Sequence, residues 1–364
     1  MIYPEFIKKG GTIGVTAPSD GNKKDTDFIR LDSAKEKLQA KGYKLMETAH
    51  VRSSYKGRST DGKTRADEFA ELIKNTDVQW IISVKGGDYL MEMLPFVDFN
   101  MVKDYPTWIQ GYSDNTGIIH TVTTNCDMAT VYGCNFNDFG MESWHKAISD
   151  NLSILEGNPI TQTSFDQYED GFYDRVTGLE GYNLGKQVYW RNVTENKTDN
   201  TTENKKDNVT GNTTDNTTKN TTTQEVTVSG RLLGGCLDVL LNLVGTKYDK
   251  TVPFLEKYKE DGILWYLESF SLSSEALTRG LWQLREAGWF QTAKGFVFGR
   301  PAFFDEEGEI SYEEAVLSAI GGLSVPVILD ADIGHKAPAM TIINGAMGTI
   351  TCVDGKGSLK MEFR

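Results

Sequence analysis

Cysteine is scarce in this sequence, and long apolar runs are absent. Four cysteines, Cys126, Cys134, Cys236 and Cys352, lie far apart in 364 residues. This spacing lacks the close pairs of a zinc site and the density of a disulfide-stapled domain, so buried free thiols are expected. No apolar stretch approaches the roughly 18 to 20 residues that span a bilayer. The first residues also lack the layout of a signal peptide, so we expect a cytoplasmic protein without a membrane partner.

Positive charge is scarce as well. The chain carries 38 Lys and Arg residues against 51 Asp and Glu residues, which gives a formal net charge of −13. Nucleic-acid backbones and anionic membranes both bind basic surfaces, so neither is expected as a partner. The net charge does not exclude small-molecule substrates. A chain of 364 residues exceeds the usual size of a single core, which predicts two domains.

The first part of the chain alternates apolar strands with amphipathic helices. The expected strands lie near residues 12–17, 43–46, 78–84, 108–112 and 129–132. One expected helix carries Phe28, Leu31, Ala34 and Leu38 at helical spacing and ends before Gly42, and a second covers 64–75. This alternation predicts a parallel sheet covered on both faces, with ligand sites at the carboxyl ends of its strands. Residues 1–160 are therefore expected to form an N-terminal α/β domain.

The second part is interpreted as a connection over residues 161–180 and a β-rich α+β domain over residues 181–364. Connections without clear periodicity are often binding loops or lids. From Asn192 to Asn220, asparagine recurs at every fourth position, mostly as Asn-x-Thr followed by a charge. Such a segment has too little apolar surface to offset the entropy lost on ordering. Residues 192–223 are therefore expected to be a disordered insertion at the tip of a β-hairpin.

A candidate nucleophile lies between Trp108 and Ile119, where the chain is predicted to run from a strand through a sharp turn into a helix. Ser113 is placed at the turn. A glycine two residues earlier lets the backbone bend tightly, and the first amides of the helix then lie beside the hydroxyl. This is the pattern of a nucleophile elbow, although Asn115 stands where a second glycine is common. The alternative is that Ser113 or Asp114 only caps the helix.

Two further residues have the chemistry that a serine nucleophile requires. An apolar strand ends on Glu268, where a buried carboxylate needs a partner. Among the four histidines, His335 lies between a glycine and a proline-anchored loop and has the best access to a site. A serine hydrolase needs a base to activate its hydroxyl and a carboxylate to orient the imidazole. Without the other two residues, the alternative interpretation of His335 is a structural role rather than a catalytic one.

Five short motifs together resemble the LD-carboxypeptidase family of serine peptidases, which includes murein LD-carboxypeptidases and the microcin C self-immunity (MccF-like) carboxypeptidases. The motifs are Lys-Gly-Gly at 85–87, Gly-Tyr-Ser-Asp-Asn-Thr at 111–116, Gly-Gly-Cys-Leu at 234–237, Leu-Glu at 267–268 and Gly-His-Lys-Ala-Pro at 334–338. They occur in the family's order. The resemblance covers nearly the whole chain apart from the asparagine array.

The resemblance implies a role for each matching residue. Ser113 would be the nucleophile, His335 the general base and Glu268 the carboxylate partner of the base. Backbone N–H groups of Gly87 and Asp114 would form the oxyanion hole. The resemblance also implies an N-terminal α/β domain that carries the serine, a C-terminal β-rich domain that carries the other two residues, and a homodimer that needs no metal or cofactor.

Other positions concern the substrate. Gly86 is expected to contact it, and Trp190 resembles the aromatic residue that stacks on a nucleotide base in the MccF-like branch. The alternative for Trp190 is packing within a strand. Lys85, Cys134 and Cys236 stand where the family often has Arg, Pro and Asn, which implies a difference in substrate positioning.

The function expected from these observations is a serine carboxypeptidase that hydrolyses an amide bond near the terminus of a small peptide or peptidyl-nucleotide. The residues alone are also compatible with a rival function that is not enzymatic. On the same fold, a noncatalytic protein that binds or senses a small molecule would use Ser113 only as a helix cap.

Overall fold

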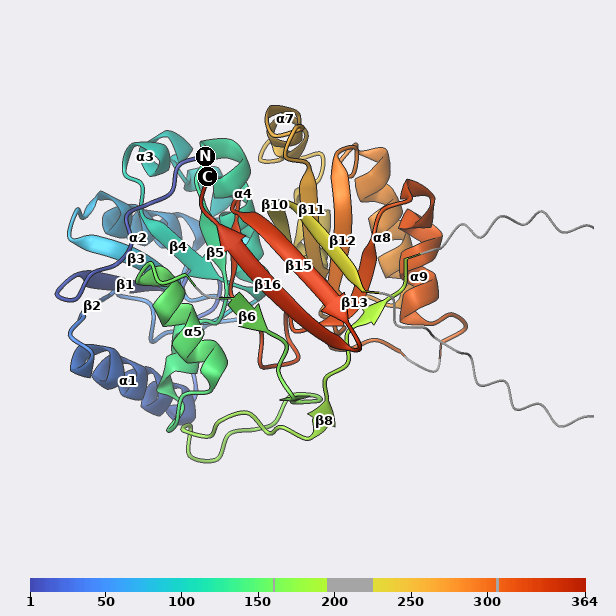
Figure 1. The fold of residues 1–364 in the computed structure, drawn as a ribbon. Coiled ribbons are helices and arrows are strands. Elements are labelled where there is room, and N and C mark those ends of the chain that lie inside the picture. Colours follow the sequence, from blue (N-terminus) through green and yellow to red (C-terminus); the bar gives the residue numbers. More distant parts are fainter. Residues whose placement is uncertain (160, 195–224, 306–307) are drawn as a thin grey trace, which may run out of the picture.

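Two sheets lie side by side and are covered by helices (Figure 1). The computed structural model describes residues 1–159, 161–194, 225–305 and 308–364. Apart from residues 192–194, the asparagine array expected to be disordered lies outside the described residues. The two chain ends lie next to each other, and the Tyr3 hydroxyl donates a hydrogen bond to the Arg364 carbonyl oxygen at 3.0 Å. Among the described helices, none is long and apolar enough to cross a membrane.

The first sheet has the strand order β14-β5-β4-β3-β1-β2, and all its pairings are parallel except that of β14. Its strands are β1 (Thr12–Thr16), β2 (Lys44–Glu47), β3 (Val78–Ser83), β4 (Trp108–Gly111), β5 (Thr130–Tyr132) and β14 (Ile342–Asn344). The helices of this half are α1 (Asp25–Ala40), α2 (Gly62–Lys74), α3 (Phe99–Asp104), α4 (Thr116–Cys126) and α5 (Lys146–Leu155). The predicted parallel sheet is confirmed, and the predicted left-handed residue after the first helix is Gly42, with φ of 97°.

The second sheet has the order β6-β16-β15-β10-β11-β12-β13-β9, with four parallel strands at its centre and antiparallel strands on both sides. Its strands are β6 (Thr161–Thr163), β9 (Arg191–Asn192), β10 (Val226–Cys236), β11 (Ile263–Glu268), β12 (Ala293–Gly299), β13 (Val327–Ala331), β15 (Met347–Val353) and β16 (Lys356–Glu362). The helices are α6 (Leu237–Leu243), α7 (Thr251–Lys257), α8 (Ser274–Glu286) and α9 (Tyr312–Ile320), and a separate pair is formed by β7 (Gln167–Tyr168) and β8 (Lys186–Gln187).

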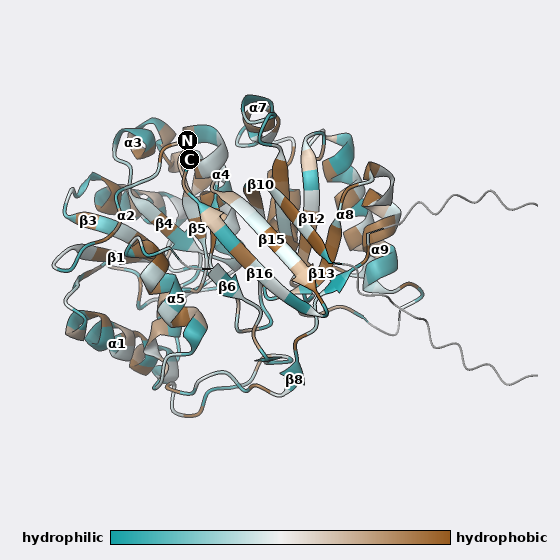
Figure 2. Cartoon of the chain, viewed as in Figure 1, coloured by the Kyte–Doolittle hydropathy of each residue, from teal (hydrophilic) through white to brown (hydrophobic). Residues whose placement is uncertain are grey.

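Helix α8 shows how local sequence places these elements. Its N-cap is Ser273, whose hydroxyl accepts a hydrogen bond from the Ala276 N–H at 3.3 Å. Leu277, Leu281 and Leu284 recur at helical spacing and are all buried. The helix therefore packs one apolar face inward and leaves a polar face to solvent, a division that Figure 2 shows across the molecule.

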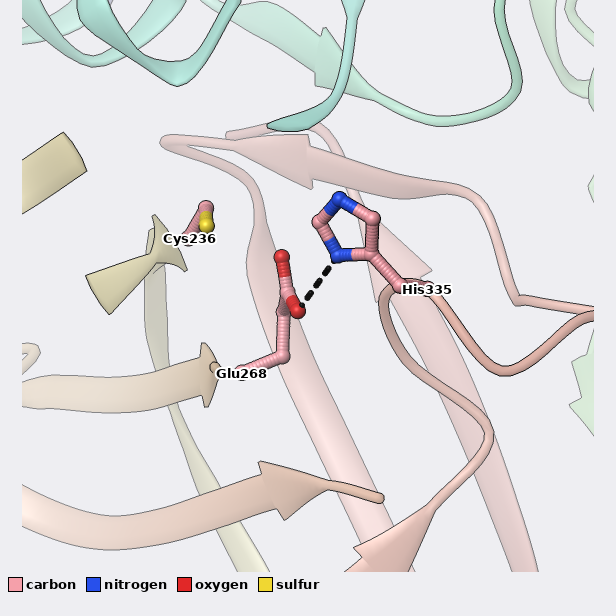
Figure 3. A group of neighbouring side chains, drawn as sticks. All are labelled: Cys236, Glu268 and His335. Carbon is pink, nitrogen blue, oxygen red and sulfur yellow. Dashed lines mark hydrogen bonds and ion pairs between the residues drawn. The ribbon is translucent and has the colours of Figure 1, made fainter. Parts of the chain in front are cut away.

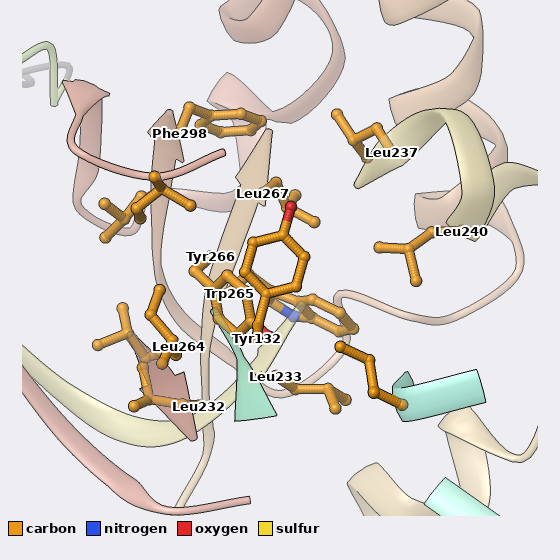
Figure 4. Packing of buried hydrophobic residues seen from close by; sticks show 14 of the residues in the cluster. Tyr132, Leu232, Leu233, Leu237, Leu240, Leu264, Trp265, Tyr266, Leu267 and Phe298 are labelled. Carbon is orange, nitrogen blue, oxygen red and sulfur yellow. The ribbon is translucent and has the colours of Figure 1, made fainter. Parts of the chain in front are cut away.

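One apolar core joins the two halves. It contains Phe69 and Ile118 from the first half together with Leu232 and Trp265 from the second. Figure 4 shows the Tyr132 ring at the end of β5 lying among side chains of β10 and β11. Because the two sheets share this core, residues at their strand ends are held in a fixed relation across the boundary between the halves.

The structure can be compared with several sequence expectations about the chain. The prediction that the asparagine array lies at the tip of a β-hairpin is wrong, because three strands of the second sheet separate β9 from β10. Helix α5 was not predicted. The four cysteines are free as expected; Cys134 is partly exposed and the other three are buried. The domain boundaries at 160 and 180 stay a prediction, although β14 belongs to the first sheet despite its place late in the chain.

Candidate active site

The predicted elbow is present between β4 and α4. Ser113 has a φ of 62°, a left-handed conformation that costs energy for a residue with a side chain. Gly111 is required here because a Cβ at this position would lie 2.6 Å from the Cβ of Asn115. The Asn115 side chain donates hydrogen bonds to the carbonyl oxygens of Lys85 and Tyr112, both at 3.1 Å. These bonds connect the turn to the loop after β3 and hold Ser113 in its strained position.

Ser113, His335 and Glu268 form a continuous hydrogen-bonded chain. The Ser113 Oγ lies 2.9 Å from His335 Nε2, and His335 Nδ1 lies 2.9 Å from Glu268 Oε2. Glu268 ends β11, His335 lies in the loop after β13, and both are buried. Figure 3 shows the carboxylate of Glu268 directed at the imidazole ring. The structure therefore brings together three residues that are distant in sequence and belong to both halves.

The second oxygen of Glu268 is also occupied. The Tyr132 hydroxyl donates to Glu268 Oε1 at 2.6 Å. A buried carboxylate is stabilised by such donors because it has lost its water. Gly334 makes room for the contact with His335, since a Cβ there would lie 2.6 Å from Glu268 Oε2. The acid is thus fixed from both sides, and its orientation does not depend on solvent.

Neither the Ser113 nor the Asp114 side chain caps the helix that follows the elbow. The Ser113 hydroxyl lies against His335, and the Asp114 carboxylate accepts hydrogen bonds from the Leu90 N–H at 2.8 Å and from the Ser19 hydroxyl. Burial raises the pKa of the Asp114 carboxyl. Asp114 therefore ties the loops after β1 and β3 to the elbow.

The loop after β3 comes close to the Ser113 side chain. A Cβ on Gly86 would lie 3.0 Å from the Ser113 Oγ, so this loop approaches the serine as only glycine allows. Asp114 follows Ser113 directly in the first turn of the helical segment, and Gly87 follows Gly86 in the loop after β3. The backbone N–H groups of Gly87 and Asp114 are the donor type that an oxyanion hole uses, and their role here stays a prediction.

A cavity of about 250 Å³ opens beside this chain of residues. Gly86, Tyr112 and His335 form part of its lining, and Lys85 and Arg175 bring positive charge to it. Rings of Phe172 and Phe270, from two different loops, lie 6.4 Å and 4.6 Å from the His335 ring. The site therefore combines the hydroxyl of Ser113, an apolar wall and cationic side chains.

Trp190 does not take part in this cavity. Its side chain is 1 % exposed, and its indole N–H donates to Asp332 Oδ2 at 3.1 Å. A Cβ on Gly357 would lie 2.1 Å from the indole, so the glycine is in close contact with the ring. The interpretation of Trp190 as a stacking platform is therefore corrected in favour of the packing alternative, because both faces of the ring are covered.

Potential metal ligands also meet at this site. One ligand atom each from Cys236, Glu268 and His335 lies within 4.8 Å of the others (Figure 3). Both oxygens of Glu268 already accept hydrogen bonds, from Tyr132 and from His335. Burial raises the pKa of the Cys236 thiol well above its usual value, which disfavours the thiolate that binds metals. The arrangement suits a hydrogen-bonded relay better than a metal site.

Comparison with known proteins identifies the family. The profile of the LD-carboxypeptidase N-terminal domain matches residues 13–133, and that of the C-terminal domain matches residues 229–350. The chain belongs to the LD-carboxypeptidase family. As a member of this peptidase family, with carboxypeptidases among its relatives, it is a serine carboxypeptidase.

Two relatives represent the family's branches. The Escherichia coli microcin C7 self-immunity protein MccF is 25% identical over 338 residues, covering 92% of this chain and 88% of MccF. A Bacillus subtilis protein described as "Probable murein peptide carboxypeptidase" is 22% identical over 361 residues, covering 96% and 92% of the two chains.

Solved structures agree with the fold of this family member. An MccF-like protein from Bacillus anthracis matches with a TM-score of 0.76 at 21% identity, covering 100% of both chains. A structure of MccF in complex with aspartyl sulfamoyl adenosine matches with a TM-score of 0.76 at 22% identity, covering 100% of this chain and 99% of the other.

Sequence reasoning missed two residues that support the site. Tyr132 was predicted only as part of a strand, yet it holds Glu268. Asn115 was noted as a departure from the elbow pattern, yet its side chain bonds the neighbouring loop. A signal for Tyr132 was its place at the end of a predicted strand, where side chains of a parallel sheet reach a site. The role of Asn115 could not be predicted from the sequence, because it depends on the Lys85 carbonyl oxygen lying next to it in space.

Proposed function

We propose that this LD-carboxypeptidase family member hydrolyses an amide bond near the terminus of a small peptide or peptidyl-nucleotide by a Ser113–His335–Glu268 triad. The observation that carries the proposal is the pair of 2.9 Å contacts that links the three side chains. A serine hydroxyl is a poor nucleophile until a base accepts its proton, and here Nε2 of an imidazole lies at hydrogen-bonding distance.

The proposed reaction uses each group in turn. His335 Nε2 takes the proton of Ser113 as its Oγ attacks the substrate carbonyl, and Glu268 supports the charge that forms on the ring. The N–H groups of Gly87 and Asp114 stabilise the developing oxyanion. His335 then gives the proton to the leaving nitrogen, and the acyl-enzyme forms on Ser113. Water, activated by His335, releases the acyl group.

Relatives support two substrate classes for this site. MccF has been solved with aspartyl sulfamoyl adenosine and with glutamyl sulfamoyl guanosine, which are aminoacyl groups joined to nucleoside analogues. The Bacillus subtilis relative is described as a murein peptide carboxypeptidase. Both kinds of substrate carry a hydrolysable bond beside an anionic or polar terminal group. A homodimer is part of the proposal, and light scattering in solution tests it.

Replacement of Ser113 by Ala tests the proposal. The protein is incubated in parallel with a murein tetrapeptide and an aminoacyl sulfamoyl adenosine, and the products are separated by chromatography. The wild type should cleave one of them, and Ser113→Ala should lose several orders of magnitude in turnover while still binding it. Equal turnover in the two proteins would exclude Ser113 as the nucleophile and favour the noncatalytic rival or another residue.

A further inference from the structure

The cavity beside His335 contains two cationic side chains that differ in their partners. Lys85 Nζ lies 3.2 Å from Asp20 Oδ2, so its charge is already paired. Arg175 lines the same cavity, and within the described part of the chain no acidic side chain forms an ion pair with its guanidinium. An unpaired guanidinium beside a reaction centre is available to a ligand.

Acidic residues in the lining are engaged elsewhere. Asp27 accepts hydrogen bonds from the N–H groups of Lys23 and Lys24 at the start of α1. Asp138 accepts from the Asn135 N–H, where it closes a capping box, and Glu169 accepts from the Asn183 N–H. Each of these carboxylates accepts a hydrogen bond from a backbone N–H group. They leave the guanidinium of Arg175 as the cationic group of the cavity without a fixed partner among the described residues.

The segment after Arg175 is fixed to the first half of the molecule. The Glu180 carboxylate accepts hydrogen bonds from the N–H groups of residues 176–178 at 2.6 to 3.0 Å, and these bonds lower the pKa of Glu180 to about 2. Arg30 on α1 donates to the carbonyl oxygens of Gly178 and Glu180 at 2.9 and 2.8 Å. The backbone next to Arg175 is therefore held in place without a substrate.

The segment before Arg175 is held over the catalytic histidine. The Phe172 ring stacks on Phe303 at 5.4 Å and meets Phe270 edge-on at 5.9 Å. Phe270 in turn lies 4.6 Å from the His335 ring. Arg175 thus lies on a segment held on both sides, between an aromatic contact above the triad and an anchored turn, and its exposed side chain lines the substrate cavity.

We propose that Arg175 binds the negatively charged group next to the bond that is cleaved, and so selects substrates with an anionic terminus. The inference rests on the proposed function and names what that site recognises. A guanidinium forms two parallel hydrogen bonds with a carboxylate or a phosphoryl-type group, which gives both affinity and orientation. The anion is either the terminal carboxylate of a peptide or the sulfamoyl or phosphoryl group of an aminoacyl-nucleotide.

Binding is measured by calorimetry in the Ser113→Ala background, so that no ligand is consumed. The added changes are Arg175→Gln, Arg175→Lys and, as a control, Arg279→Gln on the outer face of α8, where the arginine is exposed. The ligands are a murein tetrapeptide, the same peptide with a carboxamide terminus, and aspartyl sulfamoyl adenosine. The first two distinguish a carboxylate from a neutral end, and the third tests the nucleotide-type anion.

Arg175→Gln should weaken binding of one anionic ligand about 10- to 100-fold, the range of a charged hydrogen-bonded pair. The carboxamide peptide should bind all variants within about twofold, and Arg175→Lys should show an intermediate loss for the anion. Arg279→Gln should match the parent. The anionic ligand that responds identifies the source of the anion.

Three results would overturn the inference: unchanged binding of both anions in Arg175→Gln, an equal loss for the carboxamide peptide, or no binding of any ligand by the parent. Turnover by the wild type is measured separately with the same compounds. Cleavage that persists while Arg175→Gln binds normally refutes the role of Arg175 alone. Absence of cleavage, with selective loss of anion binding in Arg175→Gln, refutes the hydrolase proposal alone.

Discussion

Glu268 illustrates how a single buried side chain connects the site to the fold. Its two oxygens accept hydrogen bonds from Tyr132 at the end of β5 and from His335 after β13. Burial also raises the pKa of the Tyr132 hydroxyl well above its usual value, so the hydroxyl stays protonated and keeps donating. The carboxylate therefore fixes the imidazole in the tautomer whose free Nε2 faces Ser113.

Replacing Glu268 by Gln should lower turnover by about three to four orders of magnitude and leave the fold intact. An amide can hold the ring in the wrong tautomer, and it cannot support the positive charge that forms on His335 during the reaction. Steady-state kinetics and circular dichroism measure the two effects.

Glu275 provides the matched control for that change. It is exposed at the first turn of α8 and accepts a hydrogen bond from the Ser273 hydroxyl at 2.8 Å, so it serves the helix terminus. Glu275→Gln should keep turnover near the wild-type value. The reverse pattern, with Glu275 essential and Glu268 dispensable, would show that the carboxylate of the triad has been misassigned.

Sequence was sufficient for some residues of the site and insufficient for others. Ser113, Glu268 and His335 could be predicted because each has a chemistry that is unusual for its place in the chain and matches a family motif. Tyr132 had a signal in its place at the end of a strand, but its bond to Glu268 depends on β5 lying beside β4 and opposite β11. Trp190 was ambiguous because burial, which decides between packing and stacking, is a property of the assembled core.

At the scale of elements, helix α4 links the elbow to the second half. Most of its residues are buried, and His120 in its middle lies 3.0 Å from the Thr251 hydroxyl on α7 and stacks on Trp289 at 5.2 Å. Complete burial lowers the pKa of His120 to about 4, although nearby Asp249 opposes the shift. The imidazole is thus buried in its neutral form.

The buried His120 predicts a loss of stability in mild acid. Its folded-state pKa is near 4 and its unfolded-state pKa is near 6.5, so the stabilisation is complete above pH 6.5. As the pH falls from 6.5 to 4, protons bind the unfolded chain first, and the free energy of unfolding should fall by up to about 3 kcal/mol. Urea unfolding across this range measures the slope.

A variant separates this histidine from the carboxylates that also titrate in acid. His120→Gln removes the ionisable ring, so stability should depend less on pH between 6.5 and 4, whatever its absolute level. His50→Gln is the comparison, because His50 is partly exposed and near Glu68. An identical slope in wild type and His120→Gln would contradict the prediction.

Elements differed in how far local sequence determined them. Strands β1, β3, β4 and β11 were predictable because each is a short apolar run bounded by turn residues. Helix α5 was missed, although its N-cap is His145, whose ring accepts a hydrogen bond from the Ala147 N–H. Histidine is not a usual capping residue, so no N-cap is recognisable in the sequence at the start of this helix. The pairing of β9 with β13 was not predictable, because strand partners far apart in sequence leave no local pattern.

At the scale of the whole molecule, the second sheet brings Glu268 and His335 to the elbow of the first. The two strands that flank the asparagine array lie far apart in this sheet, because β11, β12 and β13 separate β9 from β10. With neighbouring strands about 4.8 Å apart, the ends to be joined are roughly 19 Å apart across the sheet. A tight turn cannot make this connection.

The last prediction is that residues 195–224 can be exchanged for a short neutral linker if the linker is long enough. Their sequence is nearly devoid of apolar side chains, so it offers little buried surface to the core. A Gly-Ser linker of about 12 residues reaches roughly 40 Å when extended, which exceeds the separation across the sheet. This variant should retain the wild-type melting temperature and turnover. A two-residue linker spans only about 7 Å and should unfold β9 or the start of β10. Loss of stability with the long linker would show that the array contributes to the fold, whereas full stability with the short one would show that β9 and β10 are not separated as described.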